Sequence, residues 1–145
     1  MQRYRFILMI VAVMLFSGAA MAGERVAVKG DKANVRALPD TRSDTLWQVE
    51  KYHPLLVIEK KGKWYRFKDF EGDMGWIHSS LVDHTPTVIV RVRRANIRTG
   101  PGTQHNLTFD ANKGTPFKVL EEKGRWLKVE HADGDVGWIF KSLVW

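Results

Sequence analysis

The side chains best suited to binding chemistry are tryptophans and arginines that occur twice, 62 residues apart. Trp64 and Trp126 each begin a run in which apolar and basic residues alternate, so each ring is expected on the polar face of a strand. Large aromatic residues on such a face are favoured anchors in binding interfaces. The alternative is that the rings cover the end of a barrel or pack between domains.

Four further residues share this spacing. Arg36 and Arg98 end Asn-Val-Arg and Asn-Ile-Arg segments, where each could hold a ligand carboxylate by bidentate hydrogen bonds. Alternatively, each arginine pairs with a nearby carbonyl or carboxylate and has a structural role. Trp76 and Trp138 follow glycines, and we expect them to be partly buried with one edge available to a ligand. The candidate ligand-binding residues are therefore Trp64, Trp76, Trp126, Trp138, Arg36 and Arg98.

Catalytic chemistry finds little support in the sequence. None of the histidines recurs at the 62-residue spacing, and the sequence contains no HExxH segment, nucleophile elbow or phosphate loop. The acidic pair Glu71 and Asp73 flanks a glycine, as does the pair Asp133 and Asp135, and turn chemistry explains both pairs. We expect no catalytic residue, no metal site and no cofactor. The histidines are His53, His78, His84, His105 and His131.

The spacing of 62 extends over most of the chain and sets its domain organisation. Lys61–Trp64 matches Lys123–Trp126, and Gly72–Ile77 matches Gly134–Ile139, without a gap. The two copies meet at the short proline-marked segment Asp83–Pro86. The sequence therefore predicts a first domain over residues 23–83 and a second over residues 84–145.

Each copy has the pattern of short strands. In the second copy Val88, Val90 and Val92 alternate with Arg91 and Arg93, which is typical of a half-buried strand. Glycines after acidic residues supply hairpin turns, and no stretch sustains a helical period. Several short strands in about 60 residues predict an all-β fold made of two small closed barrels. The basic residues of this first strand could attract an anionic polymer or form an ordinary charged strand face.

Residues 1–22 have the pattern of an export signal. Arg3 and Arg5 precede an apolar run of 11 residues, and Ala20-Met21-Ala22 supplies a small-x-small cleavage site. A run of 11 is too short to span the bilayer, which takes about 20 residues. Cleavage after Ala22 would lower the net charge from +7 to +5 and place the protein in the periplasm or outside the cell, with no stable membrane anchor. Nucleic acid is then not an expected partner. The absence of cysteine excludes disulfides and lipidation at a cysteine.

The repeated motifs together resemble the bacterial SH3-like (SH3b) domain. The resemblance lies in Asn-(Val/Ile)-Arg, Lys-Gly-x-Trp, Gly-Asp-x-Gly-Trp-Ile and Ser-Leu-Val, which occur in this order twice. It implies two tandem SH3-like barrels of five strands each, following a cleaved signal peptide. It also implies a non-catalytic role, with peptidoglycan or its stem peptides as the ligand. The alternative is a module that binds an envelope protein and scaffolds or regulates a cell-wall enzyme.

The same segments resemble the peptide-binding groove of eukaryotic SH3 domains, with two differences. His78 and Phe140 replace the proline of those domains, and Leu81 and Leu143 replace the groove tyrosine. Because that tyrosine helps to form the aromatic groove for polyproline helices, polyproline binding is not expected here.

Overall fold

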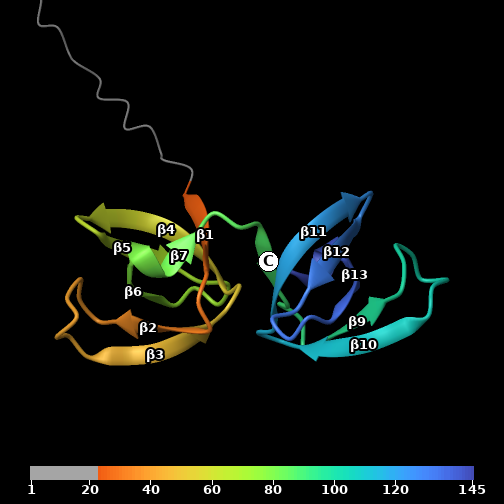
Figure 1. The fold of residues 1–145 in the computed structure, drawn as a ribbon, viewed down its shortest axis with the longest axis horizontal. Helices are drawn as coiled ribbons and strands as arrows, with labels where there is room; N and C mark the ends of the chain where they lie inside the picture. Colours follow the sequence, from red (N-terminus) through yellow and green to blue (C-terminus); the bar gives the residue numbers. More distant parts are fainter. Residues whose placement is uncertain (1–22) are drawn as a thin grey trace, which may run out of the picture.

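The computed structural model describes residues 23–145, and the segment predicted to be a signal peptide, residues 1–22, lies outside the described residues. The described chain folds into two curled antiparallel sheets that lie side by side (Figure 1). Its regular elements are strands and two short 3₁₀ helices, so the prediction of an all-β fold is confirmed. Within residues 23–145, no helix is both long enough and apolar enough to cross a membrane.

The first sheet has seven strands in the order β3-β2-β6-β5-β4-β1-β7. A 3₁₀ helix, η1, precedes its last strand. The elements are β1 (Glu24–Val28), β2 (Lys32–Arg36), β3 (Thr45–Glu50), β4 (Pro54–Lys61), β5 (Trp64–Lys68), β6 (Met74–His78), η1 (Ser79–Leu81) and β7 (Val82–Asp83).

The second sheet has six strands in the order β10-β9-β13-β12-β11-β8. Its elements are β8 (Thr87–Ile89), β9 (Arg94–Arg98), β10 (Leu107–Asn112), β11 (Pro116–Lys123), β12 (Trp126–Glu130), β13 (Val136–Phe140) and η2 (Lys141–Leu143). The five strands β9–β13 begin and end 62 residues after β2–β6. These are the five strands expected of each barrel, and the remaining short strands add to the edges of the sheets.

Each sheet wraps around its own apolar core. Phe67, Leu55 and Ile77 are fully buried in the first core, and Phe117 and Ile139 are fully buried in the second. Phe67 and its neighbour on the same strand face, Tyr65, point to the core as predicted, and so do Leu127 and Val129. Trp64 and Trp126 are half-buried on the opposite face.

The strand predicted from Val88, Val90 and Val92 is shorter than its alternation suggests. Strand β8 ends at Ile89, and both Ile89 and Val90 are fully buried. The reason is that Ile89 lies between two partners, since its backbone also exchanges hydrogen bonds of 3.1 and 2.9 Å with Trp145. A strand covered in this way buries successive residues, so the simple alternation fails.

Two glycine positions fix the local geometry of each domain. Gly72 and Gly134 have φ of 87° and 98°, which confirms the predicted hairpin turns. Gly75 and Gly137 instead allow close packing of β6 on β2 and of β13 on β9. A Cβ at Gly75 would lie 2.3 Å from Val35 Cγ1, so a side chain does not fit there without a shift.

The two domains contact each other directly. The Arg25 guanidinium lies over the Trp145 ring, and the chain end lies between the two sheets (Figure 1). Lys113 Nζ lies 4.0 Å from the Glu71 carboxylate across the same boundary.

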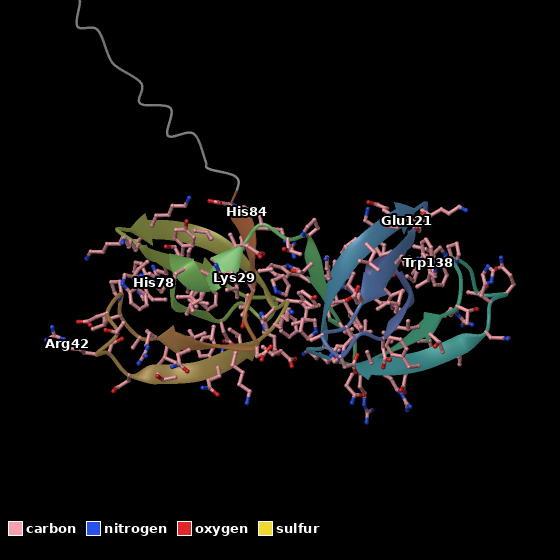
Figure 2. All side chains as sticks on the ribbon, in the orientation of Figure 1. Lys29, Arg42, His78, His84, Glu121 and Trp138 are labelled. Atoms are coloured by element: carbon pink, nitrogen blue, oxygen red, sulfur yellow. The ribbon has the colours of Figure 1, made fainter. Side chains whose placement is uncertain are left out.

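The linker is also held in place. His84, at the start of the linker (Figure 2), pairs with Glu24 of β1. Glu24 also forms an ion pair of 2.6 Å with Lys60. The hydrogen bond from Lys60, with a second from His84, lowers the pKa of the Glu24 carboxyl. The linker is therefore anchored to the edge of the first domain.

Candidate functional site

The first domain has a surface hollow of about 300 Å³ beside Trp64. We call it the first groove. It lies at the outer ends of β2, β5 and β6 and is closed on one side by η1. Its principal residues are Lys32, Asn34, Arg36, Trp64, His78 and Leu81.

The second domain has the corresponding hollow, which is larger at about 690 Å³. We call it the second groove. Each principal residue of the first groove has a counterpart here, 62 positions later. These counterparts are Arg94, Asn96, Arg98, Trp126, Phe140 and Leu143. A hollow built twice from equivalent residues is the best candidate for a functional site.

Strand pairing positions the aromatic residues of both grooves. Trp64 is directly opposite His78 in the β5–β6 pair, with ring centroids 5.2 Å apart and ring planes at 89°. Trp126 is opposite Phe140 in the same way, at 5.3 Å and 62°. Each tryptophan is therefore held edge-to-face by a second ring, in a geometry that aromatic pairs favour.

The second ring of each pair also differs in what it can bond. His78 Nδ1 accepts a hydrogen bond of 3.2 Å from the Ser80 N–H and lies 2.6 Å from Ser80 Oγ. It thereby caps η1. Phe140 makes no side-chain cap at the start of η2. The first groove thus contains an imidazole where the second offers only an apolar ring.

The arginines have a structural role in both domains. Arg36 Nη1 donates a hydrogen bond of 3.1 Å to the Ser43 carbonyl, and Arg98 Nη1 donates to the carbonyls of Thr103 and His105 at 3.2 and 3.0 Å. Each guanidinium therefore holds the loop that follows its own strand. Both arginines nevertheless line their grooves. The structural alternative considered for them is observed, and capture of a ligand carboxylate stays a prediction.

The other two tryptophans lie outside the grooves. Trp76 is the strand partner of Arg36, and Trp138 is the strand partner of Arg98, but neither lines its groove. Trp76 is half-buried, and Trp138 is only 9% exposed. The structure therefore brings together two of the candidate residues in each groove and separates the third.

Sequence reasoning missed several groove residues that share the same spacing. Lys32 and Arg94 keep a cation at equivalent positions, and Asn34 and Asn96 keep an amide that was assigned only to local backbone bonding. A search for every polar residue type retained at the offset of 62 finds both pairs.

The charged surroundings of the two grooves differ at one strand position. In the first domain Gln48 Nε2 donates a hydrogen bond of 2.9 Å to Asn34 Oδ1. Its counterpart in the second domain is Asp110, which forms an ion pair with Arg94. The cation of the second groove is thus neutralised, whereas the first groove has an amide at the same place.

The groove residues can bind but offer no reactive constellation. Aromatic faces pack against sugar rings or apolar groups, while amides and cations hydrogen-bond to polar parts of a ligand. Among residues 23–145, no group of three or more histidine and acidic side chains could hold a metal ion.

Comparison with known proteins assigns the family. The model of the bacterial SH3 domain matches residues 29–84 and, a second time, residues 91–145. The chain belongs to the bacterial SH3 domain family. As a tandem bacterial SH3 protein, it has the fold that the sequence motifs indicated.

Its relatives include cell-wall amidases. It is 22% identical over 140 residues to the putative N-acetylmuramoyl-L-alanine amidase YrvJ of Bacillus subtilis, covering 89% of this chain and 27% of that protein. It is 33% identical over 61 residues to the probable cell wall amidase LytH of Staphylococcus epidermidis, covering 41% of this chain and 21% of that protein. The bacterial SH3 chain thus spans about a quarter of the length of these curated relatives.

A solved structure of an NlpC/P60 family protein from Bacillus cereus is also similar. The identity is 16% and the TM-score 0.39, with 83% of this chain and 55% of the other chain covered.

Proposed function

We propose that this protein is a non-catalytic module that binds peptidoglycan or its stem peptides through its two grooves, in the periplasm or outside the cell. The observation that carries the proposal is the groove built twice around an aromatic pair, with a cation, an amide and an arginine at equivalent positions. A repeated site suits a repeating polymer. The relatives named as cell-wall amidases point to the same environment.

The grooves would use Trp64 and Trp126 as the main contacts. A half-buried indole offers a large rigid surface at low entropic cost, which is why tryptophan dominates many interfaces. Arg36 and Arg98 would add hydrogen bonds to polar groups at the groove edge. Two weak sites joined in one chain gain from effective concentration when both engage the same polymer.

Co-sedimentation with purified sacculi tests the proposal. Residues 23–145 should pellet with sacculi at low salt. Trp64→Ala or Trp126→Ala should each weaken binding by about 2 kcal/mol, or roughly thirtyfold, and the double variant should remain in the supernatant. Met74→Ala is the matched control, because Met74 is an exposed apolar residue of β6 outside the first groove. Failure of the wild type to pellet would refute the proposal.

A second candidate follows from the partial coverage of the relatives. Because the chain matches only about a quarter of proteins named as amidases, it could act by binding an envelope enzyme and scaffolding or regulating it. This function predicts no sacculus binding, together with recovery of one defined cell-wall enzyme after cross-linking. Recovery should then be lost on substitution of the same tryptophans.

A further inference from the structure

The two grooves share a scaffold but differ in net charge. The first groove contains Lys32 and Arg36, and no carboxylate lines it. Within residues 23–145, Lys32 forms no ion pair. Its cross-strand neighbour Glu50 lines a different hollow of the domain. The first groove therefore presents an unneutralised cation.

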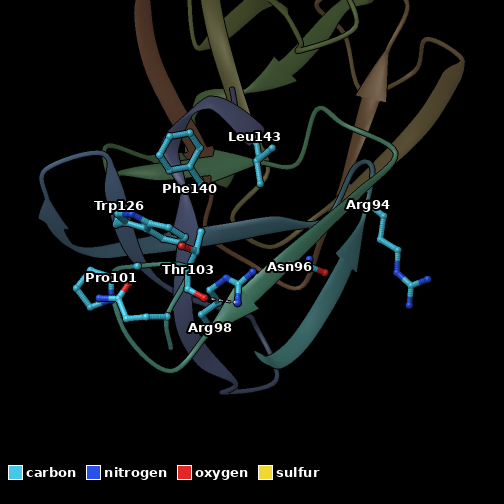
Figure 3. A pocket seen from close by; sticks show the side chains of 10 residues that line it. Arg94, Asn96, Arg98, Pro101, Thr103, Trp126, Phe140 and Leu143 are labelled. Atoms are coloured by element: carbon cyan, nitrogen blue, oxygen red, sulfur yellow. Dashed lines mark hydrogen bonds between the residues drawn. The ribbon is translucent and has the colours of Figure 1, made fainter. Parts of the chain in front are cut away.

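The second groove has lost this feature through a single exchange of residue type. Asp110 stands where the first domain has Gln48, and it holds the guanidinium of Arg94 in an ion pair. Figure 3 shows the Arg94 side chain extending away from Trp126. The other cation of this groove, Arg98, is committed through Nη1 to two loop carbonyls.

Apolar surface takes the place of charge in the second groove. Phe140 and Leu143 lie on one side of Trp126, and Pro101 lies on the other (Figure 3). The loop that carries Pro101 depends on glycine, because a Cβ at Gly102 would lie 2.3 Å from the Gln104 side chain. The result is a wide hollow in which rings, rather than charges, provide the contact.

We propose that the two grooves bind different parts of one wall ligand. The first groove captures a peptide carboxylate with Lys32, and the second packs the uncharged face of a sugar ring against Trp126. This inference rests on the proposed function and adds a division of specificity to it. The residues that set the division are Gln48 and Asp110.

The test exchanges these two residues. Gln48→Asp should supply the first groove with the carboxylate that neutralises Lys32, and Asp110→Gln should free Arg94 in the second. The probes are a synthetic stem peptide with a free carboxyl terminus and an uncharged oligosaccharide of N-acetylglucosamine. Binding is followed by NMR titration of residues 23–145, in which shifts of the Trp64 and Trp126 indole N–H signals report each groove separately.

The wild type should shift Trp64 with the peptide and Trp126 with the oligosaccharide. Gln48→Asp should weaken peptide binding about tenfold, which is the effect of one added charge near a partly exposed partner. Asp110→Gln should produce a new peptide shift at Trp126 and leave oligosaccharide binding unchanged. Raising the salt should weaken only the peptide titration. Thr45→Asp is the matched control, since Thr45 is exposed on β3 and does not line the groove.

The outcomes separate this inference from the proposed function. If the wild type pellets with sacculi but each probe shifts both tryptophans equally, or neither variant changes peptide binding, the division of specificity is wrong while the proposed function stands. If the wild type pellets and neither probe binds, the division is also wrong. If the wild type does not pellet with sacculi, both fail.

Discussion

The Arg25 guanidinium lies 4.1 Å from the centre of the Trp145 ring, so the first strand of the first domain contacts the last residue of the second. This contact joins the two ends of the described chain. Together with Lys113 and Glu71, it holds the domains against each other on both sides of the linker. The two grooves therefore belong to one body with restricted relative motion.

Removing this contact should loosen the pair of domains. Arg25→Ala should cost about 0.5–1 kcal/mol of stability, the usual size of an exposed cation–π contact. It should also shorten the rotational correlation times of the domains, measured by ¹⁵N relaxation. Arg42→Ala is the control, since Arg42 is exposed at the end of the first domain far from the second (Figure 2). Unchanged correlation times in Arg25→Ala would show that this contact does not couple the domains.

Gly75 should not tolerate a side chain. Because a Cβ there would lie 2.3 Å from Val35 Cγ1, Gly75→Ala should force β6 away from β2 and cost about 1–3 kcal/mol. Gly137→Ala should behave alike, since its Cβ would lie 2.4 Å from Ile97 Cγ2. Urea unfolding measures both. Gly30→Ala is the control, as no atom lies within 4 Å of its Cβ position. Equal stability of all three variants would contradict this account.

The loop after β9 should depend on the guanidinium of Arg98. Lysine at this position cannot reproduce both bonds from Nη1, so Arg98→Lys should cost about 1–2 kcal/mol. It should also speed hydrogen exchange of the Thr99 amide, which bonds the Asn106 carbonyl at 2.9 Å across the loop. Arg93→Lys, at an exposed position, should change neither quantity. Unaltered exchange at Thr99 in Arg98→Lys would rule out the structural role.

Stability should fall with mild acidification because of His53. This residue is 9% exposed, and burial lowers the pKa of its imidazole below the ordinary value of 6.5. The unfolded chain then takes up the proton more readily, so the contribution of His53 is complete above about pH 6.5 and declines below it, by at most about 1.4 kcal/mol per pH unit. Urea unfolding of the wild type and His53→Gln at pH 7.5 and 5.5 measures this.

The pH window separates His53 from the carboxylates. The pKa values of Glu24 and Asp133 are lowered by hydrogen bonds, so their stabilisation is lost only as the pH falls below the ordinary carboxyl range of about 4. Between pH 7.5 and 5.5 the variant should therefore lose less stability than the wild type. Equal losses would assign the pH dependence to other groups.

Much of the fold could be predicted because the sequence contains it twice. Trp64–Lys68 and Trp126–Glu130 form strands with the bounds expected from their alternation, and the glycine turns lie where predicted. The strand at Val88 was less predictable. Its burial depends on pairing with Trp145, more than 50 residues away, and local alternation contains no information about such a distant partner.

The site was predictable only in part. Trp64 and Trp126 were found because an aromatic on a polar face is conspicuous. Trp76 is equally conspicuous, but the register of β2 against β6 places it opposite Arg36, outside the groove. Register is a property of the assembled sheet. The contrast between Gln48 and Asp110 needed the same three-dimensional information, since only pairing of β10 with β9 brings Asp110 to Arg94.

The ungapped correspondence between β2–β6 and β9–β13 has a practical consequence. Every position of one domain has a reference position in the other, with the same strand bounds and loop lengths around it. A residue exchanged between the copies therefore enters a backbone that already accommodates it elsewhere in the same molecule. Such a protein acts as its own control for single-residue substitutions, and reciprocal exchanges can separate the effect of a side chain from that of the scaffold.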